Sequence, residues 1–280
     1  MENEMTNPLI QAYRKPAMYV ALPSGGKYYK SKPKLSVDGE LAIYSMTARD
    51  ELVSKTPDAL FNGEATFSLI RSCAPDIGDP HEMPVNDLMV VLVAIRKASY
   101  GPAIDVDLKC PSCNELNQLS VSIDALLATV TENKSNDTTV VGEGFTIVCT
   151  PYNLRDRTKL QLQRIKQQKL IESLTDANLN DEERQSLFGS TFVEIADLTV
   201  SLIANSIVSV QPPGGETQTD YAMVLEWLQT ITKKDYENIR ETVEALSANN
   251  IDTTFDATCQ FCENTWKTSI DIDLANFFEG

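Results

Sequence analysis

Asp107-Leu-Lys-Cys-Pro-Ser-Cys (107–113) and Asp256-Ala-Thr-Cys-Gln-Phe-Cys (256–262) share one pattern, an aspartate three residues before a Cys-x-x-Cys pair. The match continues downstream, because Ser120 and Ser269 each lie seven residues after the second cysteine. Alternating apolar and polar residues flank both pairs, as is typical of half-buried strands. The sequence therefore predicts two related hairpins, each a strand, a Cys-x-x-Cys turn (a knuckle) and a second strand.

The four cysteines of these pairs, Cys110, Cys113, Cys259 and Cys262, have the spacing of a zinc site. Two thiolates from one tight turn can reach the same ion, and two such turns complete a tetrahedral site. Four thiolates leave no open position for water or substrate, so we expect the Zn²⁺ to be structural. Disulfides or buried thiols are the alternative interpretation of the same cysteines.

The predicted fold class is α+β, a mainly helical body with short antiparallel hairpins and a discontinuous zinc ribbon built from the two knuckles. A length of 280 residues suggests about two domains. We expect a flexible N-terminal arm over 1–15, an N-terminal half over 16–130 with the first knuckle, and a C-terminal helical half over 131–280 with the second. A shared ion would interlock these halves, and its binding would contribute to folding.

Charge and hydropathy favour some partners over others. Forty acidic residues against 24 basic ones give a net charge of −16, which opposes attraction to phosphate, so we expect no nucleic-acid partner. The acidic start lacks the basic and apolar segments of a signal peptide, and the longest apolar run, 89–95, is too short to span a membrane. We therefore expect no membrane partner, and synthesis in a reducing cytoplasm where thiols remain available to a metal.

Helical periodicity accounts for most of the chain between the knuckles. The range 86–99 is apolar almost all round, which indicates a buried helix. Further helices are predicted over 64–73, 152–174, 192–208 and 220–231, and Thr232 is expected to cap another, with Asp235 in a variant of the capping box. Between them, 211–215 has the proline and glycine content of an exposed loop.

The helix over 152–174 carries six basic residues in an otherwise acidic chain. One interpretation is a solvated face that balances acidic neighbours. The other is a docking surface for an acidic protein partner.

We find no catalytic constellation in the sequence, and we expect the protein not to be an enzyme. The one histidine, His81, is predicted to be a surface loop side chain without a nucleophile beside it. Asp87 has the position of a residue at a helix N-terminus. Cys73 and Cys149 belong to neither Cys-x-x-Cys pair, and we expect them to be small buried hydrophobic side chains.

Several stretches, in this order along the chain, resemble the baseplate hub family of T-even-like contractile-tailed phages. They are Leu22-Pro-Ser-Gly-Gly-Lys-Tyr-Tyr, Met46-Thr-Ala-Arg-Asp-Glu, Asn62-Gly63, Ile95-Arg-Lys-Ala-Ser-Tyr-Gly before Cys110-Pro-Ser-Cys, the second Cys-x-x-Cys pair and Phe277-Phe278. Members of that family vary in whether both cysteine pairs are present, so the zinc prediction depends on the cysteines of this chain.

The resemblance implies a non-enzymatic structural part of the hub region of a tail baseplate. Its partners would be other baseplate and tail proteins in a symmetric hetero-oligomeric assembly, and its location the virion. A hub assembly factor that leaves before the virion is complete is an alternative, and a zinc-ribbon nucleic-acid-binding protein is another. The loop at 211–215, the basic helix and the N-terminal arm are the predicted contact regions.

Overall fold

The structure, a computed structural model, describes residues 13–54, 63–176 and 181–270. The chain forms two compact units, and both are discontinuous in sequence. Unit 1 comprises Met1–Pro80, Asp87–Glu132 and Asn249–Gly280, and unit 2 comprises His81–Asn86 and Asn133–Ala248. The predicted division into halves near residue 130 stays a prediction. Most of the N-terminal arm and the Phe277-Phe278 pair lie outside the described residues.

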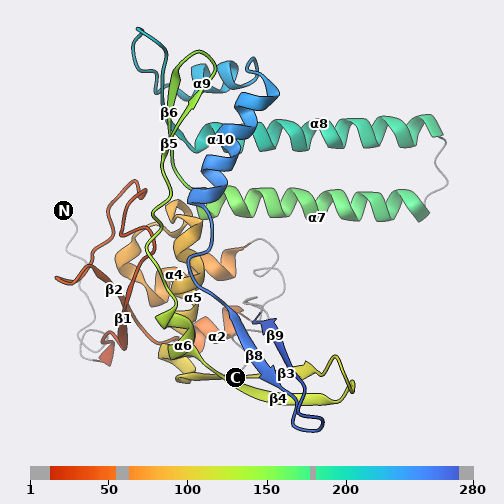
Figure 1. Ribbon diagram of the computed structural model, residues 1–280. Helices are drawn as coiled ribbons and strands as arrows, with labels where there is room; N and C mark the ends of the chain where they lie inside the picture. Colours follow the sequence, from red (N-terminus) through yellow and green to blue (C-terminus); the bar gives the residue numbers. More distant parts are fainter. Residues whose placement is uncertain (1–12, 55–62, 177–180, 271–280) are drawn as a thin grey trace. The chain divides into compact units, whose positions relative to one another are not determined.

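Unit 1 combines helices with three two-stranded antiparallel sheets (Figure 1). Its elements are β1 (Met18–Ala21), β2 (Glu40–Ile43), α2 (Ala48–Ser54), α4 (Glu64–Cys73), the 3₁₀ helix η1 (Pro75–Ile77), most of α5 (Val85–Tyr100), β3 (Ala103–Lys109), β4 (Leu116–Ser122), α6 (Ile123–Ala128), β8 (Thr254–Thr258) and β9 (Thr265–Ser269). The 3₁₀ helix η2 (Pro80–Glu82) lies where unit 1 passes into unit 2.

The helix α5 forms the centre of the core of unit 1. Val90, Val91, Val93 and Ile95 are all fully buried, and they point to more than one side of the helix. A helix that is apolar all round must have neighbours all round, so the prediction of a buried helix is confirmed.

Asp87, in the first turn of α5, holds the loop that follows β1. The backbone N–H and the hydroxyl of Ser24 donate to its carboxylate at 2.8 and 2.6 Å, and the Tyr29 hydroxyl donates at 2.8 Å. Burial, and then the adjacent carboxylate, raise the pKa of Tyr29 well above its usual value, so the phenol keeps the proton that it donates. Gly25 and Gly26 have φ of 61° and 76°, a conformation that favours glycine, which lets the chain turn toward α5.

The two predicted hairpins are present. Strand β3 pairs with β4 from Ala103↔Ser122 to Lys109↔Leu116, and β8 pairs with β9 from Thr254↔Ser269 to Thr258↔Thr265. Exposure alternates along both pairs, as the sequence alternation predicted. Each hairpin therefore ends in one Cys-x-x-Cys pair.

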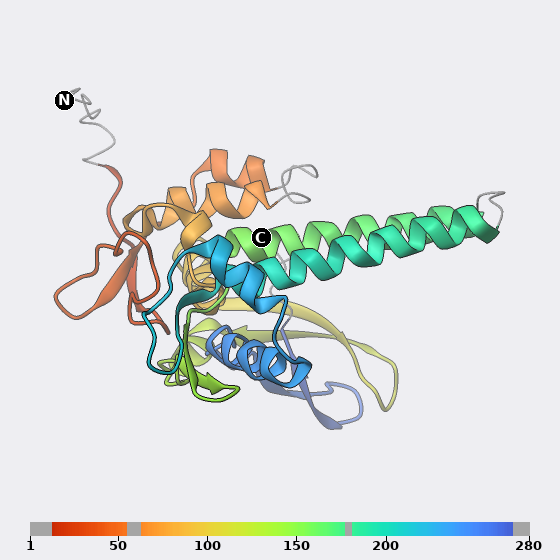
Figure 2. The ribbon, with the colours of Figure 1, turned by 90° about the horizontal axis from the view of Figure 1, so that it is seen from above.

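Unit 2 contains a three-stranded sheet of order β5-β6-β7 and four helices. Its elements are β5 (Thr138–Val141), β6 (Phe145–Cys149), α7 (Leu154–Asp176), α8 (Asp181–Asn205), β7 (Ile207–Gln211), α9 (Tyr221–Leu228) and α10 (Lys233–Leu246). Figures 1 and 2 show α7 and α8 side by side, extending well beyond α9 and α10. The cap of α10 is as predicted, because the Thr232 hydroxyl accepts from the backbone N–H of Asp235.

Both predicted ends of one helix are wrong. The helix expected over 192–208 begins at Asp181 and ends at Asn205, and Ile207–Gln211 is strand β7. The carbonyl of Ser206 accepts from the N–H of Thr150 at 2.7 Å, and β7 then pairs with β6. The apolar spacing fitted a helix, but β-branched residues such as Ile207 and Val208 also suit a strand, and here the neighbouring strand β6 decides the outcome.

The mixed fold of helices and small antiparallel strand pairs agrees with the predicted α+β class. In the part of the chain that the structure describes, no helix combines the length and the apolar character needed to cross a bilayer.

Candidate metal centre

The first knuckle is a tight turn between β3 and β4. The N–H of Cys110 donates to the carbonyl of Glu115 at 2.9 Å, and the N–H of Asn114 donates back to the Cys110 carbonyl at 2.9 Å. Asn114 has φ of 61°, a left-handed conformation that asparagine tolerates better than most residues. The N–H of Ser112 donates to the Cys110 sulfur at 3.4 Å, so the turn directs a backbone dipole at that sulfur.

The second knuckle, between β8 and β9, repeats this geometry. The N–H of Cys259 donates to the carbonyl of Asn264 at 2.9 Å, and the N–H of Glu263 donates to the Cys259 carbonyl at 3.1 Å. Glu263 has φ of 59°, and the N–H of Phe261 donates to the Cys259 sulfur at 3.4 Å. The two turns thus correspond residue for residue, as their sequences do.

The four sulfurs of the knuckles come together as one group. Sγ of Cys110 lies 3.7 Å from that of Cys262, Sγ of Cys113 lies 3.6 Å from that of Cys259, and all four sulfurs lie within 4.8 Å of one another. A tetrahedral site with metal–sulfur bonds of about 2.3 Å has sulfur–sulfur edges of roughly 3.8 Å. The two closest separations match this edge, and the four thiols are close enough together to hold one metal ion.

The group is partly shielded from solvent. Cys110 and Cys259 are buried, Cys113 is half-buried, and Cys262 is exposed. All six cysteines of the chain are free thiols, so disulfide bonds do not explain the pairing. Burial acts to raise the pKa of Cys259, but N–H donors from Cys262 and Phe261 outweigh it and lower that pKa to about 6. These donors favour the thiolate at Cys259. At Cys113 the N–H of Glu115 acts to lower the pKa, but burial and the neighbouring thiols outweigh it and raise that pKa to about 12.

Asn117 on β4 joins the two knuckles and was not predicted. Its side chain is fully buried, donates to the Glu115 carbonyl at 2.9 Å and accepts from the N–H of Gln260 at 2.8 Å. The Gln260 side chain in turn donates to the carbonyl of Gln118 at 3.1 Å. The sequence shows a polar residue four positions after a Cys-x-x-Cys pair. It does not show the partner of that residue, which lies 143 residues away.

Two further polar residues considered at the sequence level lie outside this group. His81 is half-buried in η2 and does not belong to the ligand group, which consists of four thiols. Asp87 binds Ser24 and Tyr29 as described above. Cys73 and Cys149 are fully buried, as expected of small apolar side chains.

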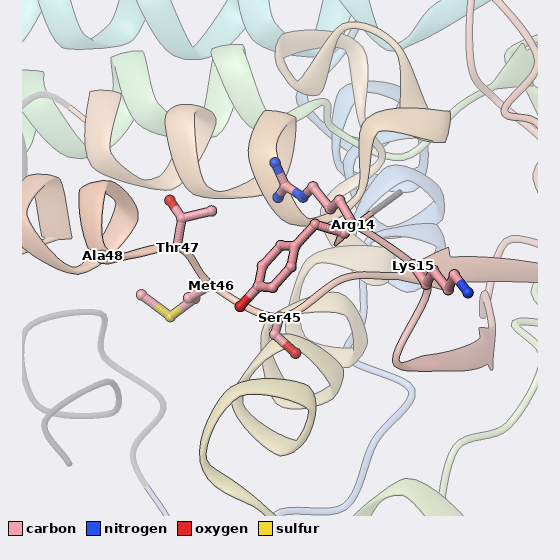
Figure 3. Close-up of a pocket in the computed structure, with 7 residues that line it drawn as sticks. Arg14, Lys15, Ser45, Met46, Thr47 and Ala48 are labelled. Atoms are coloured by element: carbon pink, nitrogen blue, oxygen red, sulfur yellow. The ribbon is translucent and has the colours of Figure 1, made fainter. Parts of the chain in front are cut away.

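A pocket of about 440 Å³ lies in unit 1 between residues 13–15, before β1, and residues 45–48, after β2 (Figure 3). Polar side chains that line the pocket donate hydrogen bonds to neighbouring segments of unit 1. Arg14 donates to the carbonyl of Ser72 at 2.6 Å, the Ser45 hydroxyl donates to the Ala98 carbonyl, and the Thr47 hydroxyl donates to Asp50. The pocket is therefore lined by groups that stabilise the unit itself.

Two matched hairpins closed on a four-thiol group define a protein with a two-knuckle site that can hold a metal ion. Residues 16–279 match the family model of the T4 bacteriophage base plate protein, and because this is nearly the whole chain, the protein belongs to that family. It is accordingly a structural component of a phage tail baseplate. Neither the curated proteins nor the solved structures contain a match to this chain.

Proposed function

We propose that the protein is a non-enzymatic part of the central hub region of a contractile phage tail baseplate, with one structural Zn²⁺ held by Cys110, Cys113, Cys259 and Cys262. The single observation that carries the zinc proposal is the group of four sulfurs, from both knuckles, that lie within 4.8 Å of one another. Membership of the baseplate family supports the placement in the tail. The resemblance to hub proteins favours the central region within it.

The role of the ion follows from the connectivity of unit 1. Its last segment begins at Asn249, well over a hundred residues after the first knuckle, so the ion would join β3–β4 to β8–β9 across a long loop of chain. Closing a long loop costs conformational entropy, and bonds to a metal offset that cost. A preformed pair of hairpins loses less entropy when partners bind, which suits a part of a larger assembly.

The charge around the knuckles bears on the alternative of a nucleic-acid-binding protein. Exposed acids there include Asp105, Asp107 and Glu115, against Lys109, so the surface opposes phosphate and does not favour a nucleic-acid binder. A hub assembly factor that is not retained in the virion would have the same fold and the same metal site. Mass spectrometry of purified virions distinguishes such an assembly factor from a structural hub component, because only a component that is retained is present in the finished tail.

Elemental analysis of the purified protein tests the metal site. We expect about one zinc per chain. Cys110→Ser and Cys262→Ser should both lose it, because each removes one ligand from a different knuckle. Cys149→Ser alters a buried thiol outside the group and is the matched control, which should retain zinc.

Loss of metal in only one ligand variant, or a wild-type protein without metal and with the four knuckle thiols reactive, would contradict the zinc proposal. The hub placement is tested separately, because a baseplate purified with the protein in a peripheral position would contradict it whatever the metal content.

A further inference from the structure

The helices α7 and α8 form an antiparallel pair with 23 and 25 residues, each about 35 Å long at 1.5 Å per residue. The Gln163 side chain donates to the Glu194 carboxylate at 3.3 Å and sets the register between them. Figures 1 and 2 show that the far part of the pair runs beyond the other elements of unit 2. The pair therefore offers a long surface that the rest of unit 2 leaves uncovered.

Among the positions of the pair whose exposure the structure describes (154–165, 167–169 and 193–205), the buried ones lie at its base. The buried residues are Leu154 and Asp156 on α7 and Leu202, Ile203 and Ala204 on α8. Farther out, seven apolar side chains are half-buried or exposed, among the positions whose exposure the structure describes: Leu160, Leu162, Ile165, Val193, Ile195, Leu198 and Val200. Val193 is 60% exposed. Two helices alone cannot bury such residues on all sides, and further helices complete a bundle.

The two helices have opposite charge. The sequence of α7 contains six basic and three acidic residues, whereas α8 contains one basic and five acidic. Arg164 on α7 is exposed, as are Glu194 and Asp197 on α8. The pair is thus nearly neutral as a whole, although the chain carries −16. Two copies can approach through this pair with far less repulsion than through the rest of the surface.

We propose that the α7–α8 pair is a self-association surface on which a second copy of this chain docks, forming an antiparallel four-helix bundle. A two-fold axis places α7 of one copy against α8 of the other at two equivalent contacts. The basic helix then meets the acidic helix twice, so that the charges are complementary and the apolar residues are covered. This inference does not depend on the metal site.

Sedimentation of the full chain over a wide concentration range tests the proposal, with two charge-reversed variants. Arg164→Glu with Lys169→Glu places two acids on α7 where they would face the acids of α8, and Glu194→Lys with Asp197→Lys places two lysines on α8 where they would face the basic residues of α7. The wild type should dimerise, and each variant alone should dimerise at least roughly thirtyfold more weakly because like charges then face one another. An equimolar mixture of the two variants should form a heterodimer.

The matched controls change the same charges elsewhere in unit 2. Lys233→Glu with Lys234→Glu, and Glu216→Lys with Glu226→Lys, alter exposed residues outside the pair and should dimerise as the wild type does. Helical circular dichroism and thermal melting establish that each variant is folded. If a double variant melts early, Arg164→Glu and Asp197→Lys are used singly, with a smaller weakening expected.

Three results would overturn the proposal. A wild-type protein that stays monomeric throughout would leave the α7–α8 pair to a different partner. Dimers that tolerate both reversals would place the interface elsewhere. Variants that are monomeric alone and remain so when mixed would show that α7 does not face α8 of the second copy.

Discussion

The side chain of Asn117 illustrates how one buried amide can organise a long-range contact. It satisfies a carbonyl within its own knuckle and an N–H of the other, 143 residues away. Buried polar groups that lose a partner cost more than the hydrogen bond itself contributes, because they cannot turn to water. The amide is therefore expected to determine how the two hairpins meet, in addition to the proposed metal ion.

Replacing this amide should destabilise unit 1 without removing a ligand. We expect Asn117→Ala to lower the free energy of unfolding by about 1–3 kcal/mol, since the N–H of Gln260 loses its acceptor and the carbonyl of Glu115 keeps only the N–H of Cys110. Urea unfolding followed by fluorescence measures the change. Gln118→Ala, on an exposed neighbour that uses only its backbone carbonyl here, should stay within about 0.5 kcal/mol. Equal effects in the two variants would argue against the proposed role of Asn117.

The two cysteines outside the knuckles should be chemically inert in the native protein. Burial raises the pKa of both Cys73 and Cys149 to about 12, and alkylating reagents attack the thiolate. At pH 8 iodoacetamide should leave both unmodified in the native state and label both in denaturant, as peptide mass spectrometry would show. Rapid native labelling of either residue would mean that its surroundings open readily.

At the scale of single elements, helix ends depend on side chains that the sequence makes visible. Thr47 precedes α2, and its N–H and hydroxyl both donate to Asp50, which completes a reciprocal cap. At the start of α10, the Thr232 hydroxyl accepts from the backbone N–H of Asp235. The Asp235 carboxylate also accepts from the N–H of Gly142, so this cap fixes the helix to the turn after β5.

Removal of the second cap provides a test at this scale. Thr232→Ala should lower the free energy of unfolding by about 1 kcal/mol, because the N–H of Asp235 loses its acceptor. Thr242→Ala, in the middle of the same helix, removes a hydroxyl that only bonds the Asn238 carbonyl one turn earlier. Alanine is the better helix former there, so the control should be neutral or slightly stabilising in the same thermal melts.

For the whole molecule, the division into two units predicts where the effect of metal removal is felt. The four cysteines all belong to unit 1, whereas α7 to α10 and the three-stranded sheet belong to unit 2. Chelation should therefore increase hydrogen exchange first in β3, β4, β8 and β9, because bonds to the metal contribute to the folding of these hairpins. Exchange in β6 and α10 should change less. A uniform rise throughout the chain would show that the units unfold together.

Features that depend on residues close together in the sequence were predicted better than features that depend on contacts between distant segments. The knuckles, the buried helix α5 and the cap at Thr232 were predicted correctly, because spacing, periodicity and capping act over a few residues. The strand β5 was missed, since Thr138–Val141 is short and follows a polar stretch. The helix predicted over 192–208 wrongly included Ile207 and Val208, which belong to strand β7, the strand that pairs with β6.

The sequence by itself determined which side chains the knuckles carry: four thiols in two Cys-x-x-Cys turns with equivalent flanking residues. Only the tertiary structure decided that Cys110 lies beside Cys262 and Cys113 beside Cys259, that Asn117 connects the knuckles, and that α7 and α8 extend together with opposite charge. The reason is physical. Local preferences depend on neighbouring residues, whereas these contacts depend on how distant segments pack once the core has formed.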